Sequence, residues 1–248
     1  MVSVLRSSQY YDVAALAAEV AAARRMLDFG AGTFEHSISL PAEGDINAAH
    51  RGHRNNNPYA GALDSCPLFA EIFNSFRAEK ACYRLLRRKA GTAYSLHDDK
   101  DVDENLVRMQ MPVVTNGSAL LLVQKDGAEL EPIARQVEQY TRDDGKPVMF
   151  DYTRYAREFG EWFDALLLEP GYFHLIDPTR VHTLINAGDA DRVTLCIDML
   201  RNDWLDGWLS EHMSREVPAL PVDSWPEGTW EWGALQHGLL THPRVSLT

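Results

Sequence analysis

The sequence is poor in cysteine, in long apolar runs and in positive charge, and each shortage argues against a class of protein. Its three cysteines, Cys66, Cys82 and Cys196, are an odd number without CxxC spacing, which argues against a disulfide framework or a zinc knuckle and favours a reducing compartment. No stretch approaches the roughly 18 apolar residues that a membrane-spanning helix needs. The net charge of −12 argues against non-specific binding to nucleic acid or anionic membranes. We therefore expect a cytoplasmic protein whose partner is a small molecule or another protein; the sequence indicates no oligomeric state.

The first 90 residues are predicted to be mainly helix and loop. Residues 10–27 are rich in alanine and apolar at helical spacing, while charged residues interrupt the apolar run that a signal peptide would need. Residues 42–61 are polar and turn-forming, which predicts a loop. Residues 67–89 return to helical spacing and end in a basic cluster, where cations suit the helix dipole. Together these segments predict a helical N-terminal flank over residues 1–90.

After Gly91 the pattern changes from a helical period to alternation, which marks the start of a β-rich part. Five short strands separated by turn residues are expected, over residues 106–114, 118–125, 172–177, 181–186 and 192–199. Several short strands of this kind favour an antiparallel sandwich or barrel over a parallel sheet. The chain is therefore predicted to be mainly β with flanking helices, and residues 91–200 to be its core.

Alternation also assigns side chains to faces of the expected strands. Arg108 and Gln110 point the same way. In the last strand Arg192 shares a face with Thr194 and Cys196, which are small, while bulky apolar residues occupy the opposite face. This contrast predicts that Arg192 points into the interior of a barrel.

Four residues of the β-rich part carry the strongest chemical signal. His97 and Asp99 lie two residues apart, so an extended backbone places both on one face, and His182 and Arg192 follow on two strands that one hairpin can join. Two histidines and a carboxylate can cap one face of an octahedral iron(II) ion and leave adjacent positions open for a co-substrate and dioxygen. An arginine supplies a planar fork for a carboxylate, which suits the far end of 2-oxoglutarate.

Two stretches resemble a known enzyme family. Residues 95–117, with His97-Asp98-Asp99, Arg108-Met109-Gln110 and Pro112-Val113-Val114-Thr115-Asn116, resemble the first metal-binding half of the aspartyl/asparaginyl β-hydroxylase-like branch of the iron(II)/2-oxoglutarate dioxygenases. Residues 168–200, with His182, Asn186, Gly188 and Asp191-Arg192, resemble its second half and are also similar to free-proline hydroxylases. The resemblance implies a double-stranded β-helix (jelly-roll, cupin-like) barrel, iron(II) held by His97, Asp99 and His182, and 2-oxoglutarate held chiefly by Arg192.

The details of the co-substrate site stay open at this point. Gln110 stands where the peptide hydroxylases have a histidine, and Arg108 could hold a carboxylate or form a structural ion pair. The residues expected to line the cofactor site are Arg192, Arg108, Gln110 and Thr194. Asp101 or Asp103 could replace the predicted aspartate ligand, and residues 97–104 could instead be a solvated acidic turn.

We expect residues 1–248 to form a single domain that ends in a C-terminal segment, residues 201–248. Its tryptophans are expected to pack that segment against the barrel; they are Trp204, Trp208, Trp225, Trp230 and Trp232. Residues 128–167 form an insertion too long for a plain strand connection. They predict either a lid that closes over the substrate or, mainly over residues 153–167, an outer helix that thickens the barrel wall.

These features predict an oxygenase that uses iron(II), 2-oxoglutarate and dioxygen. The expected reaction is hydroxylation of a C–H bond in an amino acid or an amino-acid-derived small molecule, with release of succinate and carbon dioxide. Desaturation or cyclisation of the substrate stays open. The alternatives are a peptidyl Asp/Asn-type hydroxylase, a redox-silent cupin-like metal isomerase or hydrolase, and a non-catalytic barrel that binds a small ligand.

Overall fold

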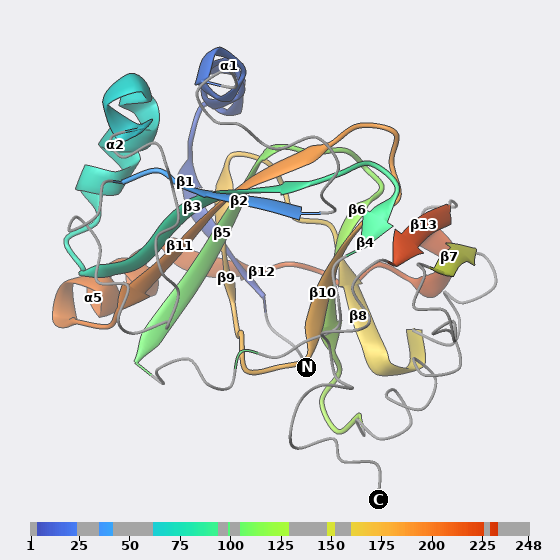
Figure 1. Ribbon diagram of the computed structural model, residues 1–248. Helices are drawn as coiled ribbons and strands as arrows, with labels where there is room; N and C mark the ends of the chain where they lie inside the picture. Colours follow the sequence, from blue (N-terminus) through green and yellow to red (C-terminus); the bar gives the residue numbers. More distant parts are fainter. Residues whose placement is uncertain are drawn as a thin grey trace, which may run out of the picture.

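Two β-sheets face each other across the middle of the protein (Figure 1). The computed structural model describes residues 4–23, 35–41, 62–93, 99, 105–128, 148–151, 160–225 and 229–232. The large sheet has the order β12 (Met213–Glu216), β1 (Leu5–Tyr10), β9 (Tyr172–Ile176), β5 (Leu106–Val114), β11 (Arg192–Leu200), β3 (Lys80–Arg88) and β2 (Glu35–Ser39). The small sheet has the order β7 (Val148–Asp151), β13 (Thr229–Trp232), β4 (Thr92–Ala93), β10 (His182–Asn186), β6 (Ala119–Gln124) and β8 (Phe163–Leu166).

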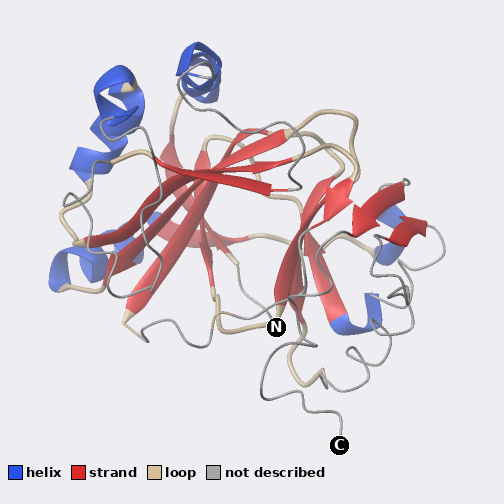
Figure 2. Cartoon of the chain, in the orientation of Figure 1, coloured by secondary structure: helices blue, strands red, loops and turns tan. Residues whose placement is uncertain are grey.

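Eight of these strands define the topology. In chain order β3, β4, β5, β6, β8, β9, β10 and β11 lie in the large, small, large, small, small, large, small and large sheet, and neighbours within each sheet pair antiparallel. Two four-stranded sheets connected in this way are a jelly roll. The strand order therefore confirms the predicted double-stranded β-helix, with β1, β2 and β12 added to the large sheet and β7 and β13 to the small one (Figure 2).

Three helices cover one face of the large sheet, which we call the outer face (Figure 1). They are α1 (Val13–Ala23), α2 (Pro67–Ser75) and α5 (Asp203–His212). Their apolar side chains pack against Met109, Leu195 and Ile197, all fully buried. Because each such side chain contributes about 1.5–3 kcal/mol on burial, this layer supplies much of the stability of the fold.

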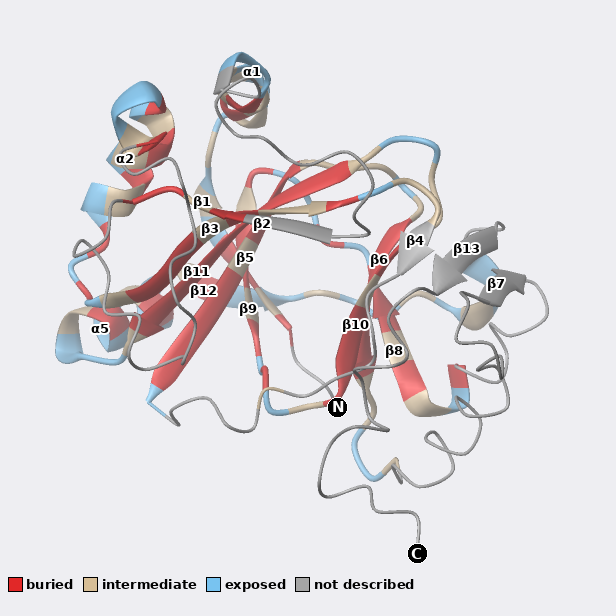
Figure 3. Cartoon of the chain, in the orientation of Figure 1, coloured by how far each residue is buried: buried red, intermediate tan, exposed pale blue. Residues whose placement is uncertain are grey.

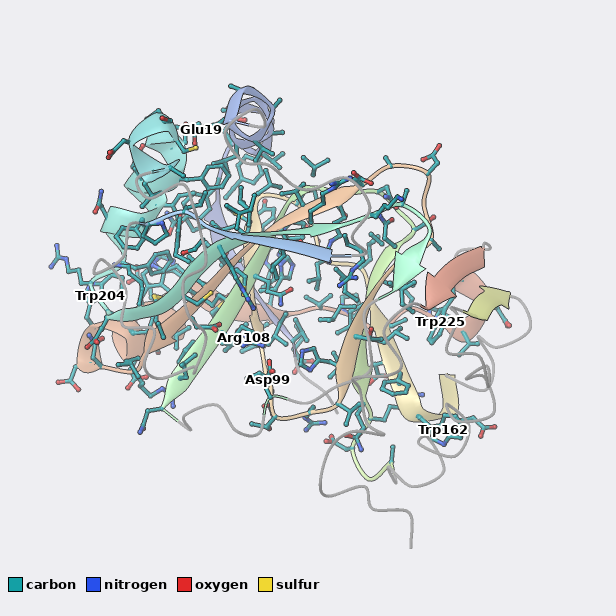
Figure 4. The ribbon with its side chains drawn as sticks, viewed as in Figure 1. Glu19, Asp99, Arg108, Trp162, Trp204 and Trp225 are labelled. Atoms are coloured by element: carbon teal, nitrogen blue, oxygen red, sulfur yellow. The ribbon has the colours of Figure 1, made fainter. Side chains whose placement is uncertain are left out.

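Polar groups fix the ends of two of these helices. The carboxylate of Glu19, on α1, accepts hydrogen bonds from the backbone N–H groups of Leu68 and Phe69, each at 3.0 Å, at the start of α2 (Figure 4). Asn202 caps α5 by accepting from the N–H of Leu205 at 2.9 Å. These contacts satisfy backbone donors that the helices themselves leave without partners.

The five predicted strands agree with β5, β6, β9, β10 and β11 to within one residue at each end. The expected turn after β6 is present, with Gly127 at a φ of 74°, a backbone conformation that glycine adopts without strain. All three cysteines are buried and free, as expected for a chain without a disulfide framework. Among the described helices, none is long and apolar enough to cross a membrane.

The predicted helix over residues 67–89 is wrong in its second half. Helix α2 ends at Ser75, and Lys80–Arg88 forms β3. This strand lies between β11 and β2 and is buried on both faces, so apolar residues occur on both of its sides and imitate helical spacing. The flank over residues 1–90 is consequently not simply helical: it adds β1, β2 and β3 to the large sheet.

The predictions for residues 10–27 and for the insertion over residues 128–167 also need correction where the structure describes them. The helix expected over residues 10–27 begins only at Val13, because Tyr10 ends β1. Within the insertion, residues 163–166 form β8, a core strand of the small sheet, instead of an outer helix. Most of the rest of the insertion, and the loop over residues 42–61, lie outside the described residues, so the lid stays a prediction.

The C-terminal segment packs on the barrel where the structure describes it. Trp204 and Trp208 on α5 meet the ring of Phe76 edge to face, with ring centroids 6.1 and 5.1 Å away. Trp225 is buried, and β12 extends the large sheet. These contacts confirm the packing role predicted for three of the tryptophans. Trp230 and Trp232 belong to β13, and their side chains lie outside the described set.

Candidate active site

The inner face of the large sheet, which looks toward the small sheet, is polar although most of it is buried (Figure 3). Strand register places on it, from β1 to β3, the side chains of Arg6, His174, Arg108, Gln110, Arg192, Thr194, Cys196, Asp198, Arg84 and Arg88. The outer face of the same strands is apolar. As predicted, Arg108 and Gln110 point the same way, and Arg192 shares its face with Thr194 and Cys196.

The inner face of the small sheet is mainly apolar. Leu121 and Val123 of β6 pack with Ile176 of β9, which lies on the inner face of the large sheet. His182 is the Cα partner of Val123, so its side chain also lies on the face that looks toward the large sheet. His182 and Arg192 thus come from different sheets and share the interior between them.

Arg192 is a buried cation with unused hydrogen-bond donors. Its relative exposure is 1%, and its Nε and Nη1 atoms have no hydrogen-bond partner. Burial lowers the pKa of the guanidinium, and the like charge of Arg88, its Cα partner on β3, lowers it further. An arginine remains protonated at neutral pH. Because a buried charge is costly unless it is paired, the arrangement favours an anionic ligand at this point.

A network of polar side chains holds the hairpin from which Arg192 emerges. Asn186 donates to the carbonyl of Ala190 at 2.9 Å and accepts from Nδ2 of Asn116 at 3.0 Å. A Cβ at Gly188 would lie 2.5 Å from Oδ1 of Asn116, so a larger residue there would have to displace the Asn116 side chain from this network. Asp191 accepts from Nε of Arg87 at 2.8 Å. These motif residues therefore position the start of β11.

Thr194 and Gln110 lie on the same inner face as Arg192. Thr194 comes two residues after Arg192 on β11, so the two side chains share a face. It is 1% exposed, and its Oγ1 has no hydrogen-bond partner. Gln110, on β5, is the Cα partner of Cys196 on one side and of His174 on the other. Thr194 thus presents an unused hydroxyl beside the guanidinium, and Gln110 is half-buried in the middle of the inner face.

Arg108 takes part in an ion pair, which is the structural alternative left open by the sequence. Its Nε and Nη2 donate to the two carboxylate oxygens of Asp198 at 2.9 and 3.2 Å, and Nη1 donates to Asp99. Burial opposes the charge, but the carboxylate of Asp198 outweighs it and raises the pKa of Arg108. All three nitrogens are thus engaged by carboxylates, and the contact of Arg108 with the co-substrate stays a prediction.

Asp99 and His182 belong to the same end of the barrel. The backbone N–H of Asp99 donates to the carbonyl of Pro178 at 2.8 Å, in the turn that leads into β10. The carboxylate of Asp99 accepts from Arg108, and the two side chains lie between the sheets (Figure 4). Nδ1 of His182 lies 2.8 Å from the carbonyl of Arg180. Because a carbonyl can only accept, Nδ1 carries a proton, so Nε2 is the ring nitrogen whose lone pair becomes available when the imidazole is neutral.

His97, the first predicted metal ligand, lies outside the described residues, as do Asp101 and Asp103. Within the described part of the chain, no group of three histidine, cysteine, aspartate or glutamate side chains stands ready to hold a metal ion. The triad of His97, Asp99 and His182 therefore stays a prediction. The structure adds that Asp99 and His182 both lie beside the turn at Pro178 that leads into β10.

No sequence pattern singled out His174 and Arg6, yet both lie on the inner face. His174 is fully buried, and its ring nitrogens make no well-formed hydrogen bond. Burial is the main reason that its pKa falls to about 4; backbone groups of Gln110 and Tyr172 oppose the fall, and the charges of Arg192 and Arg6 add to it. Alternation along residues 172–176 could have indicated the direction of His174. Its neighbours could not be predicted, because they depend on which strands pair with β9.

Comparison with known proteins adds structural likeness at low identity. No protein-family model and no curated protein matches the sequence. HygX from Streptomyces hygroscopicus, solved with nickel and 2-oxoglutarate bound, is 12% identical with a TM-score of 0.48, over 96% of this chain and 95% of that one. AviO1 from Streptomyces viridochromogenes Tue57 is 14% identical with a TM-score of 0.41, over 88% and 93%. A 2OG-Fe(II) oxygenase family oxidoreductase from Burkholderia pseudomallei is 10% identical with a TM-score of 0.36, over 68% and 69%. Since all three TM-scores are below 0.5, the fold rests on the strand order.

Proposed function

We propose that the protein is an iron(II)- and 2-oxoglutarate-dependent oxygenase that hydroxylates a C–H bond of an amino acid or an amino-acid-derived small molecule. The observation that carries the proposal is Arg192, a fully buried guanidinium with two donors unused inside a jelly roll. A planar fork of this kind matches a carboxylate in geometry and charge. Thr194 adds an unused hydroxyl on the same face. The distal carboxylate of 2-oxoglutarate would satisfy both groups.

The metal would be held at the other end of the same interior by His97, Asp99 and His182. Two features of the described residues fit this role. The carbonyl of Arg180 fixes the tautomer of His182 so that Nε2 carries the lone pair, which is the usual support for a metal-binding histidine. Arg108 orients the carboxylate of Asp99 and is itself held by the buried Asp198. Iron(II), together with 2-oxoglutarate and dioxygen, would supply oxidation of the substrate, with succinate and carbon dioxide as products.

The chain's own contribution is to bind, orient and exclude water. Arg192 and Thr194 would fix the far end of the co-substrate, and the network around Asn116 and Asn186 would keep Arg192 in place. The apolar inner face of the small sheet, with Leu121 and Val123, would keep water from the reacting groups. The parts of the insertion over residues 128–167 that lie outside β7 and β8 would supply the lid.

A release assay for succinate tests the proposal. The protein is incubated with iron(II), ascorbate and 2-oxoglutarate, and amino acids and their derivatives are added one at a time. We expect succinate to form in proportion to one substrate, and Arg192→Met to lower its formation by well over tenfold at a low, sub-saturating concentration of 2-oxoglutarate. Arg201→Met is the matched control, because Arg201 is half-exposed and pairs with Asp206 on the surface. An unchanged dependence of succinate formation on 2-oxoglutarate concentration in Arg192→Met would contradict the proposed role of Arg192.

The same assay separates the alternatives. A redox-silent metal isomerase or hydrolase would bind a divalent metal and turn over without 2-oxoglutarate. A non-catalytic barrel would bind a carboxylate at Arg192 and retain no stoichiometric metal. A peptidyl hydroxylase would release succinate only with peptides that contain Asp or Asn. Succinate release with a free amino acid or its derivative is the outcome that supports the proposed small-molecule oxygenase.

A further inference from the structure

Strands β1 and β9 carry a second group of buried polar atoms on the inner face of the large sheet. Both nitrogens of His174 and the Nε of Arg6 make no well-formed hydrogen bond, although backbone groups of Gln110 and Tyr172 lie near the imidazole, and the two side chains are 0% and 8% exposed. Most buried polar groups in proteins are satisfied, so three unsatisfied atoms side by side need an explanation. Neither residue is used by the function proposed above.

Strand pairing brings these two residues together. Arg6 on β1 and His174 on β9 are Cα partners in an antiparallel pair, which places their side chains next to each other on one face. The guanidinium of Arg6 lies over the ring of Tyr172, 4.4 Å from its centroid, and Nη1 donates to the carboxylate of Glu169. The stacking and the ion pair hold the plane of Arg6, while its Nε remains unsatisfied on the buried side.

The charge and donor pattern of the pair selects its ligand. With a pKa of about 4, His174 is neutral at physiological pH and offers one N–H donor and one acceptor. Arg6 offers a positively charged N–H donor next to it. Two donors, one of them charged, in a buried setting suit a carboxylate better than a cation or an apolar group.

We propose that Arg6 and His174 form a second carboxylate-binding point inside the barrel, distinct from Arg192. Its occupant is a carboxylate of the bound organic ligand. The assignment of that ligand rests on the proposed function: the carboxylate belongs either to 2-oxoglutarate or to an amino-acid-like substrate. In the second case the pair selects substrates with a free carboxylate, which makes His174 and Arg6 specificity-determining residues.

Acetate tests the binding point without relying on turnover. In protein labelled with 15N-histidine, the ring signals of His174 are identified by their loss in His174→Leu. Sodium acetate is then titrated against sodium chloride at equal ionic strength, in Arg192→Met so that the first carboxylate point is removed. We expect a saturable shift of the His174 signals. The shift should disappear in Arg6→Met on the Arg192→Met background and persist in Arg201→Met on that background.

Two outcomes would overturn the inference: no saturable shift in Arg192→Met, or an equal shift after Arg6→Met is added. If Arg6→Met does not fold, Arg6→Lys keeps the positive charge but removes Nε, and the affinity for acetate should fall at least several-fold. Because variants of His174 lack its ring signals, their affinity for acetate is measured by calorimetry: His174→Gln keeps an N–H donor near the same position and should retain part of the affinity, whereas His174→Leu should lose it. Equal affinity in these two variants would show that the ring makes no contact.

The source of the carboxylate follows from two additions to the wild-type protein. If 2-oxoglutarate alone shifts the His174 signals to saturation, the carboxylate is that of the co-substrate. If the signals move only when glycine, L-proline or L-aspartate is added in the presence of 2-oxoglutarate, it is that of the substrate. If the wild-type protein does not bind 2-oxoglutarate at all, the proposed function is contradicted. The acetate response in Arg192→Met would still show whether Arg6 and His174 bind a carboxylate.

Discussion

The two faces of the large sheet are made by the same strands but differ in how well their side chains are satisfied. On β11, Leu195 and Ile197 point outward into the apolar layer under the helices, whereas Arg192 and Thr194 point inward and have unused polar atoms. Each outward side chain contributes about 1.5–3 kcal/mol on burial. Each buried polar group without a partner costs about 1–3 kcal/mol. The outer face therefore stabilises the fold, and the inner face gives up stability to hold a ligand.

Within the inner face, Arg108 and Asp198 are an exception, because their polar atoms are fully engaged. Asp198→Leu should lower the free energy of unfolding by about 3–5 kcal/mol, since it leaves Arg108 buried without its main partner. The double variant Arg108→Met/Asp198→Leu should recover most of that loss. Urea unfolding measures both. A double variant as unstable as Asp198→Leu would show that the cost is not that of an unpaired charge.

The outer face is tested by Ile197→Ala, one residue before Asp198. We expect a loss of about 2–5 kcal/mol in the free energy of unfolding, because Ile197 is fully buried under the helices. The affinity for 2-oxoglutarate, measured by calorimetry at a temperature where the variant is folded, should not change. A large fall in affinity would mean that the two faces are not independent.

The lowered pKa of His174 predicts how the free energy of unfolding depends on pH. Its pKa in the folded protein is about 4, because of burial and of the charges on Arg192 and Arg6, against 6.5 when unperturbed. Between these values the unfolded chain takes up a proton that the folded protein does not, so the free energy of unfolding rises with pH from about 4 to about 6.5. In metal-free protein, His174→Gln should flatten this rise. Identical slopes for the variant and the wild type would contradict the buried neutral imidazole.

The smallest effect is expected for Thr194→Val, which removes an unsatisfied hydroxyl and keeps the shape of the side chain. Without ligand, the stability should stay within about 1 kcal/mol of the wild type or rise. The affinity for 2-oxoglutarate should fall a few-fold. A stability loss as large as that of Ile197→Ala would mean that Thr194 packs like an outer-face residue.

The comparison also explains what could be predicted from the sequence. The alternation of small polar and bulky apolar residues along 192–199 correctly indicated that Arg192 points inward, because one strand with two different faces has a clear period of two. Lys80–Arg88 is buried on both faces, so its apolar residues imitated a helix. The ion pair of Arg108 and the pairing of Arg6 with His174 depend on which distant strands become neighbours. A local pattern does not contain that information.

The most direct measurement is the affinity of 2-oxoglutarate for the metal-loaded wild-type protein and for Arg192→Met, by calorimetry. Losing a buried charge-assisted pair costs about 2–5 kcal/mol, which corresponds to a fall of roughly 30-fold or more in affinity. The free energy of unfolding of the ligand-free variant should at the same time equal or exceed that of the wild type, because the variant no longer buries an unpaired cation. Unchanged affinity for 2-oxoglutarate in Arg192→Met would contradict the account. So would a variant that binds 2-oxoglutarate more weakly but is also less stable than the wild type.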